Sequence, residues 1–172
     1  MKQSCILFLL LCSFPIVLHG QSSAQKPCEI SEEFRQFDFW IGEWTVEDST
    51  GTKLGDSSVQ SILDGCVVFE NWENPGAGYS GKSLNYYNAA IGMWEQKWID
   101  NQGAPIEFKG TYDSAEKTLK FSGSGFQGGN TVKYRLNFHE IKDDYVRQQF
   151  FAFDPSREVW VLIFDGHYRR KK

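Results

Sequence analysis

The sequence predicts an all-β protein, an antiparallel up-and-down β-barrel of about ten strands preceded by a short N-terminal helix. Aromatic residues make up 16% of the 172 residues, and their wide, flat side chains favour strands over helices. Short runs of strand character also recur at regular spacing, with turn-forming segments rather than long helices between them. Closing such a meander into a barrel would remove its exposed strand edges.

The N-terminal segment has the composition of a secretory signal. Lys2 is its only charge, and residues 6–17 are almost wholly apolar, a run too short to span a bilayer comfortably. Cleavage after Gly20 or after Ala24 would leave a small residue at the cut, and we favour Gly20. We therefore expect a protein exported to the periplasm or secreted, without stable membrane insertion once the signal is removed.

The remaining chain divides into a lead and one domain. After a signal over 1–20, we expect an N-terminal lead over 21–36 and a single barrel domain over 37–172. Ser31, followed by acidic residues, is typical of a helix start, and this helix can last only about two turns before a strand pattern begins at Phe39.

The barrel strands are expected in segments bounded by Gly, Asn, Asp and Pro. In the first strand, Trp44 and Val46 alternate with the polar Thr45 and Glu47, which indicates one apolar face. The later strands are expected at 57–63, 66–72, 83–87, 94–100, 106–112, 118–122, 131–139, 145–153 and 159–168. A Gly-rich loop is expected over 74–81.

Signal cleavage would leave two cysteines, Cys28 and Cys66. In an oxidising compartment an even pair suggests one disulfide, which would tie the N-terminal lead to a strand. The alternative is two separate thiols, and the sequence leaves both open because it does not give the distance between them.

The net charge of −4 argues against non-specific nucleic-acid binding, which depends on clustered Lys and Arg. The only basic run, 169–172, ends the chain and is interpreted as a solvated tail. The sequence predicts no oligomeric state.

The pair Gly42-x-Trp44, on the first strand and just after a short helix, resembles the opening signature of the lipocalin and calycin superfamily. The resemblance implies that Trp44 closes the floor of the barrel. It also implies that an Arg near the last strand, here Arg169 or Arg170, packs over this Trp in a cation–π contact.

A closer resemblance covers nearly the whole mature chain. The segments that carry it are 37–44 (FDFWIGEW), 65–66 (GC), 70–72 (ENW), 81–85 (GKSLN), 94–98 (WEQKW) and 164–168 (FDGHY). They are similar to a family of small exported bacterial proteins of unknown function. The resemblance implies a calycin-like barrel and implies no activity, because a fold does not determine function.

Two predicted strands place polar side chains on an otherwise aromatic inner face. Gln96 shares a face with Trp94 and Trp98, while Glu70 shares a face with Trp72. Buried polar groups normally have partners. We expect Asn85 or Tyr87 to serve Gln96, and Arg135 or Arg147 to serve Glu70.

These residues suggest three functions. The leading hypothesis is a binding protein that holds a small apolar or aromatic molecule in the barrel, because small-molecule sites combine apolar walls with a few polar groups. In this hypothesis indoles supply stacking surface and polar side chains orient the ligand; the residues are Glu70, Trp72, Asn85, Trp94, Gln96 and Trp98. One alternative is an enzyme that uses Glu70 as a general acid or base. The other is an interaction module with a filled barrel, which would act through the loop over 74–81.

We favour binding over catalysis, and we predict no cofactor. His139 and His167 form no metal-ligand cluster. Some haem-binding barrels that handle nitrogen oxides use one His near the C-terminus, so His167 is a haem candidate. Its sequence neighbours differ from that group, which favours a surface histidine.

Overall fold

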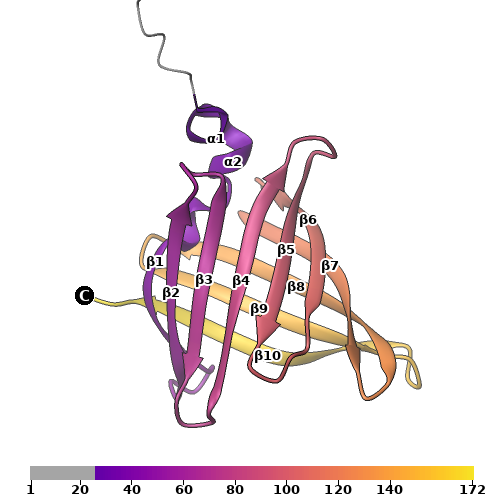
Figure 1. Cartoon of the computed structure of the whole chain (residues 1–172). Helices are drawn as coiled ribbons and strands as arrows, with labels where there is room; N and C mark the ends of the chain where they lie inside the picture. The colour runs from indigo at the N-terminus through magenta and orange to yellow at the C-terminus, as the bar shows by residue number, and fades with distance from the viewer. Residues whose placement is uncertain (1–25) are drawn as a thin grey trace, which may run out of the picture.

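The computed structural model describes residues 26–172 and confirms the predicted fold class (Figure 1). The strands form a closed antiparallel barrel in which each pairs with its sequence neighbours, and β1 also pairs with β10. The strands are β1 Gly42–Glu47, β2 Lys53–Ile62, β3 Val67–Asn74, β4 Tyr79–Asn88, β5 Met93–Asp100, β6 Ile106–Asp113, β7 Thr118–Gln127, β8 Asn130–Lys142, β9 Tyr145–Asp154 and β10 Val159–Arg170. The predicted signal and its cleavage site lie outside the described residues.

Three single helical turns precede the barrel: α1 Pro27–Ile30, α2 Glu32–Arg35 and the 3-10 turn Asp38–Trp40. The first two, α1 and α2, lie above one end of the barrel in Figure 1. The strand expected from Phe39 begins only at Gly42, because the 3-10 turn carries the preceding aromatic residues into the barrel end. Within residues 26–172, the structure contains no helix with the length and apolar character needed to cross a membrane.

Aromatic rings fill the end of the barrel that lies below the helices. Phe37 and Trp40 are fully buried and stack with their ring centroids 5.0 Å apart. The Phe37 ring also packs edge-on against Trp94 and Phe138, and Trp40 contacts Phe138 at 4.5 Å. Each buried aromatic ring removes a large apolar surface from water, so this end is a solid core and the barrel is closed here.

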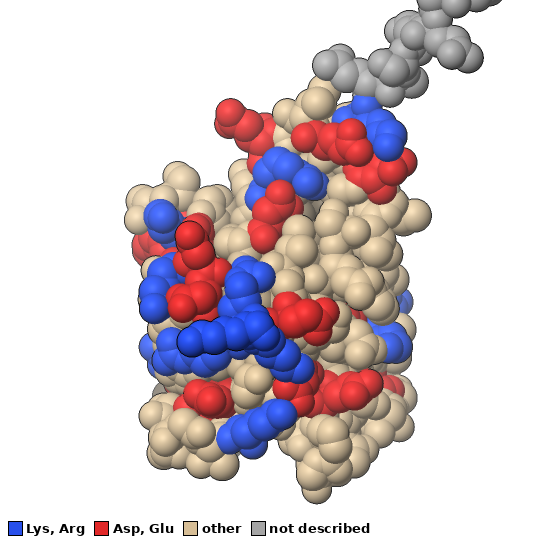
Figure 2. Space-filling view, turned by 90° about the vertical axis from the view of Figure 1, so that its left-hand side faces the viewer, with Lys and Arg blue, Asp and Glu red and all other residues tan. Residues whose placement is uncertain are grey.

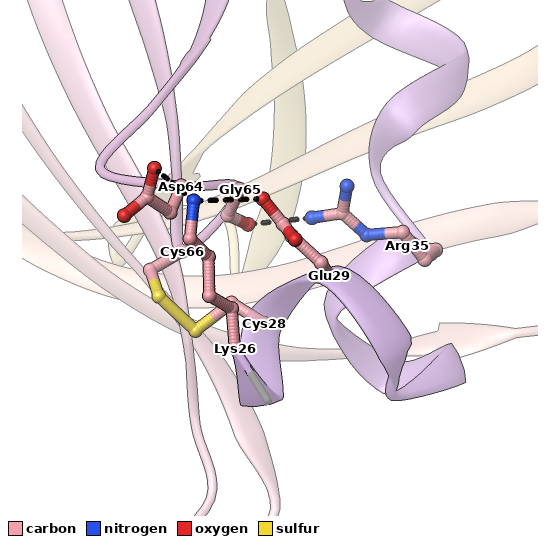
Figure 3. The surroundings of a disulfide bond; sticks show 7 residues. All are labelled: Lys26, Cys28, Glu29, Arg35, Asp64, Gly65 and Cys66. Carbon is pink, nitrogen blue, oxygen red and sulfur yellow. Dashed lines mark hydrogen bonds and ion pairs between the residues drawn. A yellow bond between two sulfur atoms is a disulfide. The ribbon is translucent and has the colours of Figure 1, made fainter. Parts of the chain in front are cut away.

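A disulfide between Cys28 and Cys66 joins the N-terminal lead to the connection between β2 and β3 (Figure 3). The sequence left this bond open. Lys26 lies beside it and forms ion pairs with Asp64 at 2.9 Å and with Glu29 at 3.4 Å. These contacts hold the helical turns against the closed end.

Trp44 is fully buried at this closed end, and its indole N–H donates to the carbonyl oxygen of Trp40 at 2.8 Å. Arg170 covers the indole, with its guanidinium carbon 4.3 Å from the ring centroid, and donates to the carbonyl oxygen of Ile41. Of the two arginines considered from the sequence, Arg170 is therefore the one that packs over Trp44. Arg169 points to the other side of the strand and stacks over Tyr145 at 3.7 Å.

The basic run at the C-terminus is not simply a solvated tail, so that prediction is wrong. Arg169 and Arg170 belong to β10, and Lys171 forms an ion pair with Asp56 at 2.9 Å. Lys53 pairs with the same carboxylate. Figure 2 shows blue and red side chains interspersed on this side of the molecule, as these pairs require.

The Gly-rich loop predicted over 74–81 is shorter in the structure. Asn74 ends β3 and Tyr79 begins β4, so the connection spans only the residues between them. Asn74 and Tyr79 face each other across the two strands. The glycines at 76 and 78 lie in the turn, whereas Gly81 lies inside β4, where it has a packing role described below.

Candidate functional site

The barrel encloses a cavity of about 390 Å³ in its other half, away from the helical turns. It opens between the ends of β3, β4 and β5 and beside the half-exposed Ile163 of β10. The apolar and aromatic lining residues are Leu54, Trp72, Trp98, Ile106, Phe108, Leu136, Phe150, Ile163 and Phe164. The polar lining residues are Glu70, Asn74, Tyr79, Gln96, Asp100, Gln148 and Tyr168. The interaction-module alternative assumed a filled barrel. The cavity shows that this half of the barrel is not filled.

Two glycines allow the indoles in the cavity wall to lie against neighbouring strands. A Cβ atom at Gly81 would stand 2.2 Å from the six-membered ring of Trp98, and one at Gly55 would stand 2.9 Å from that of Trp72. Real Cβ atoms do not approach so closely. The missing side chains therefore give Trp98 and Trp72 room to lie against β4 and β2 in the cavity wall.

Glu70 is the most unusual residue of the lining, because it is only 3% exposed and has no cationic partner among residues 26–172. Its two oxygens accept hydrogen bonds from Ser57 at 2.9 Å and Ser83 at 3.1 Å. The Tyr168 hydroxyl lies 3.4 Å from Oε1 and 2.6 Å from the side-chain oxygen of Gln148. Burial raises the pKa of Glu70 to about 7, although these hydroxyl groups act in the opposite direction.

A chain of hydrogen bonds runs from Gln96 to Glu70 around the inner wall. The Gln96 amide donates to Asn85 at 2.6 Å, the Asn85 amide donates to Ser83 at 3.0 Å, and Ser83 donates to Glu70. Asn85 also donates to the carbonyl oxygen of Val68. Because every donor in this chain points towards Glu70, the network fixes the carboxyl group and supplies no positive charge.

The arginines expected to serve Glu70 point away from it, so that prediction is wrong. Arg147 forms a bidentate pair with Asp165, and Arg135 stacks over Trp160 at 4.1 Å. On β9, Val146 is buried inside the barrel, so alternation places Arg147 outside. Gln96 bonds to Asn85, which is one of the two partners predicted for it. The other predicted partner, Tyr87, instead packs beside Phe34 and Trp94.

Four of the six predicted ligand-binding residues line the cavity: Glu70, Trp72, Gln96 and Trp98. The other two do not. Trp94 belongs to the aromatic core of the closed end, and its indole N–H donates to Gln36 at 3.1 Å. Asn85 is fully buried behind the wall, where it connects Gln96 to Ser83.

His167 is not in the cavity. Its neighbours Gly166 and Tyr168 are buried on the inner side of β10, so His167 lies on the outer side, 2.7 Å from the Tyr145 hydroxyl. His139 likewise bonds to Thr118 and Gln149. Residues 26–172 contain no group of three or more His, Cys, Asp or Glu side chains placed to hold a metal ion.

Several residues that line the cavity were not identified from the sequence. Tyr168 shares an inner face with Phe164 through Gly166, and Gln148 shares one with Phe150, so strand alternation was the available signal. Asn74, Tyr79 and Asp100 were missed because they were assigned to a loop or a strand end. The Tyr79 hydroxyl donates to Asp100 at 3.0 Å, which places a second carboxylate at the mouth.

Comparison with known proteins gives a family and no activity. No curated protein matches the chain. A family model described as "Protein of unknown function (DUF1579)" matches residues 29–170. This range includes all ten strands of the barrel and most of the helical turns that precede them. The chain therefore belongs to this family of proteins of unknown function.

Proposed function

We propose that this protein is an exported carrier that binds a small, largely apolar or aromatic molecule in the open half of its barrel. The observation that carries the proposal is the cavity of about 390 Å³, which has aromatic walls and several polar side chains, Glu70 among them, at its depth. Small-molecule sites are typically cavities of about 300–1,000 Å³ with this composition, so the ligand is at the small end of the range. Export is supported by the signal-like sequence and by the Cys28–Cys66 bond.

The proposal includes a relationship to the lipocalin-like (calycin) barrels. Its support is the closed end, where Trp44 follows a short helical segment and lies under Arg170 from the last strand. This closed end also gives the cavity a floor, because Trp40 and Trp44 both contact the Tyr168 ring that lines the cavity.

Native mass spectrometry of the exported protein from its own host tests the binding function. We expect a retained small molecule that is lost under denaturing conditions. Ile163→Trp should remove it, because Ile163 lines the cavity mouth and is 50% exposed, so an indole there fills the entrance with little effect on the core.

Ile141→Trp is the matched control, since Ile141 is also 50% exposed but does not line the cavity. This variant should retain the molecule. Only unliganded masses for the native protein, or equal retention by the two variants, would contradict the proposed site.

A second candidate function is acid–base catalysis in the same cavity. It is favoured by Glu70, whose pKa of about 7 lets it donate or accept a proton near neutral pH, and which is not neutralised by an arginine. In that case Glu70→Gln should abolish conversion of a molecule that the wild type converts. If the molecule recovered from the native protein stays unchanged during incubation with wild type, the binding function alone remains.

A further inference from the structure

We infer that the ligand carries a protonated amine, and that Glu70 is the counter-ion that receives it between the indoles of the cavity wall. This inference rests on the proposed binding function and specifies the chemistry of its ligand. It comes from the distribution of charge in the cavity rather than from its size.

The charged side chains of the cavity lining are all acidic. Within residues 26–172, two carboxylates line the cavity, Glu70 at depth and Asp100 at the mouth, and the lining contains no Lys, Arg or His. An anionic ligand would therefore meet two like charges and no compensating one. A cation meets the opposite situation, because both carboxylates attract it.

Glu70 has free hydrogen-bonding capacity for such a cation. An ionised carboxylate can accept about four hydrogen bonds. Here one serine hydroxyl donates to each oxygen, and the Tyr168 hydroxyl makes only a long contact of 3.4 Å with Oε1 because it lies 2.6 Å from the side-chain oxygen of Gln148. A buried carboxylate without a counter-ion is unfavourable, and a charged donor relieves this better than a neutral one. An ammonium group that donates to Glu70 would complete a pairing for which the protein supplies only neutral partners.

The walls above Glu70 also suit a cation attached to an apolar body. Across the strands, Glu70 pairs with Ser83 and Ser83 pairs with Trp98, so the Trp98 indole lies in the row of Glu70. Trp72 follows two residues along β3 and lies one row closer to the mouth. Indole faces attract ammonium groups most strongly among aromatic rings, and they also stack on an apolar or aromatic ligand body.

Protonation of Glu70 would couple binding to pH. The titratable side chains that share the cavity with Glu70 are Tyr168 of β10, Tyr79 of β4 and Asp100 of β5, while β2 contributes the neutral Ser57. Burial raises the pKa of both tyrosines, that of Tyr79 to about 12, so both stay neutral near pH 7. An amine that arrives at pH 6 would therefore displace the proton of Glu70.

Isothermal titration calorimetry with three probes that share a phenylethyl body tests this inference: 2-phenylethylamine, 2-phenylethanol and 3-phenylpropionate. At pH 8 we expect the amine to bind about tenfold or more tightly than the alcohol, since a hydrogen bond to a charged group is worth roughly that factor. The carboxylate should bind most weakly. Between pH 6 and 8 the affinity for the amine should rise about tenfold, because Glu70 has a pKa of about 7.

The same titrations, repeated at pH 6 in buffers of different ionisation enthalpy, count the protons released. Amine binding to the wild type should release close to one proton, and alcohol binding should release none. Glu70→Gln should lose the preference for the amine over the alcohol, its pH dependence and the proton release. Asp100→Asn is the control, because it removes the carboxylate at the mouth and leaves Ser57 and Ser83 on Glu70, so proton release should persist.

Two outcomes separate this inference from the proposed function. If the alcohol binds as tightly as the amine, without proton release, the amine inference is overturned and the binding function stands. If none of the three probes binds wild type at millimolar concentration, both are overturned. Proton release that is lost in Asp100→Asn and kept in Glu70→Gln would also overturn the role of Glu70.

Discussion

Replacing Cys28 and Cys66 together by serine is expected to lower the free energy of unfolding by about 4 kcal/mol. The bond joins residues separated by 38 positions, and for a loop of this length the lost chain entropy of the unfolded state corresponds to about this value. Urea unfolding of the double variant and of oxidised wild type measures the difference. The change is a large part of the stability of a typical domain, about 5–15 kcal/mol.

Wild type treated with reductant serves as the control for the serine side chains, and it should lose the same stability as the double variant. The double variant itself should be insensitive to reductant. A midpoint that is equal for oxidised wild type and the double variant would contradict the role of this bond in holding the helical turns to the closed end.

Glu70→Gln is expected to stabilise the empty protein by about 3 kcal/mol at pH 8 and to have little effect below pH 4.5. The folded chain raises the pKa of this carboxyl from 4.5 to about 7, so the folded state binds the proton more tightly than the unfolded state does. The difference between these pKa values corresponds to about 3 kcal/mol. Below pH 4.5 both states hold the proton and no penalty arises, whereas above about pH 7 the full penalty is present.

Urea unfolding at several pH values between 4 and 8 measures this effect. Wild type should lose stability as the pH rises from 4.5 to about 7 relative to Glu70→Gln. The matched control is Glu73→Gln on the same strand, since Glu73 is exposed and is not part of the cavity lining. Parallel stability profiles for Glu70→Gln and Glu73→Gln would show that the buried carboxyl carries no such penalty.

Alternation along the chain was sufficient to predict the strands and the inner faces. Trp94, Gln96 and Trp98 were placed on one face of β5, and all three do point into the barrel. The position of each along the barrel axis did not follow from alternation. It depends on the helical turns, because Phe37 fills the end beside Trp94 and leaves the other end, beside Trp98, open.

The partners of Glu70 show a second limit of the sequence. Ser57 and Ser83 come from the strands on either side of β3, and their side chains are small and common, so nothing in the sequence marks them as partners. Tyr168 comes from a strand that is not adjacent to β3, and its contact depends on closure of the barrel. An arginine was expected instead because sequence reasoning assumes that a buried carboxylate is paired, and this cavity is the exception.

Glu70, a buried carboxyl group with no cationic partner among residues 26–172, is proposed to receive the ligand at the depth of the cavity. The most direct test is to follow the side-chain ¹³C signal of Glu70 by NMR, assigned by its loss in Glu70→Gln, in the empty protein and with saturating 2-phenylethylamine. We expect titration near pH 7 in the empty protein, and an ionised Glu70 already at pH 6 when the amine is bound. Titration near the ordinary value of 4.5, with no response to the amine, would contradict the account.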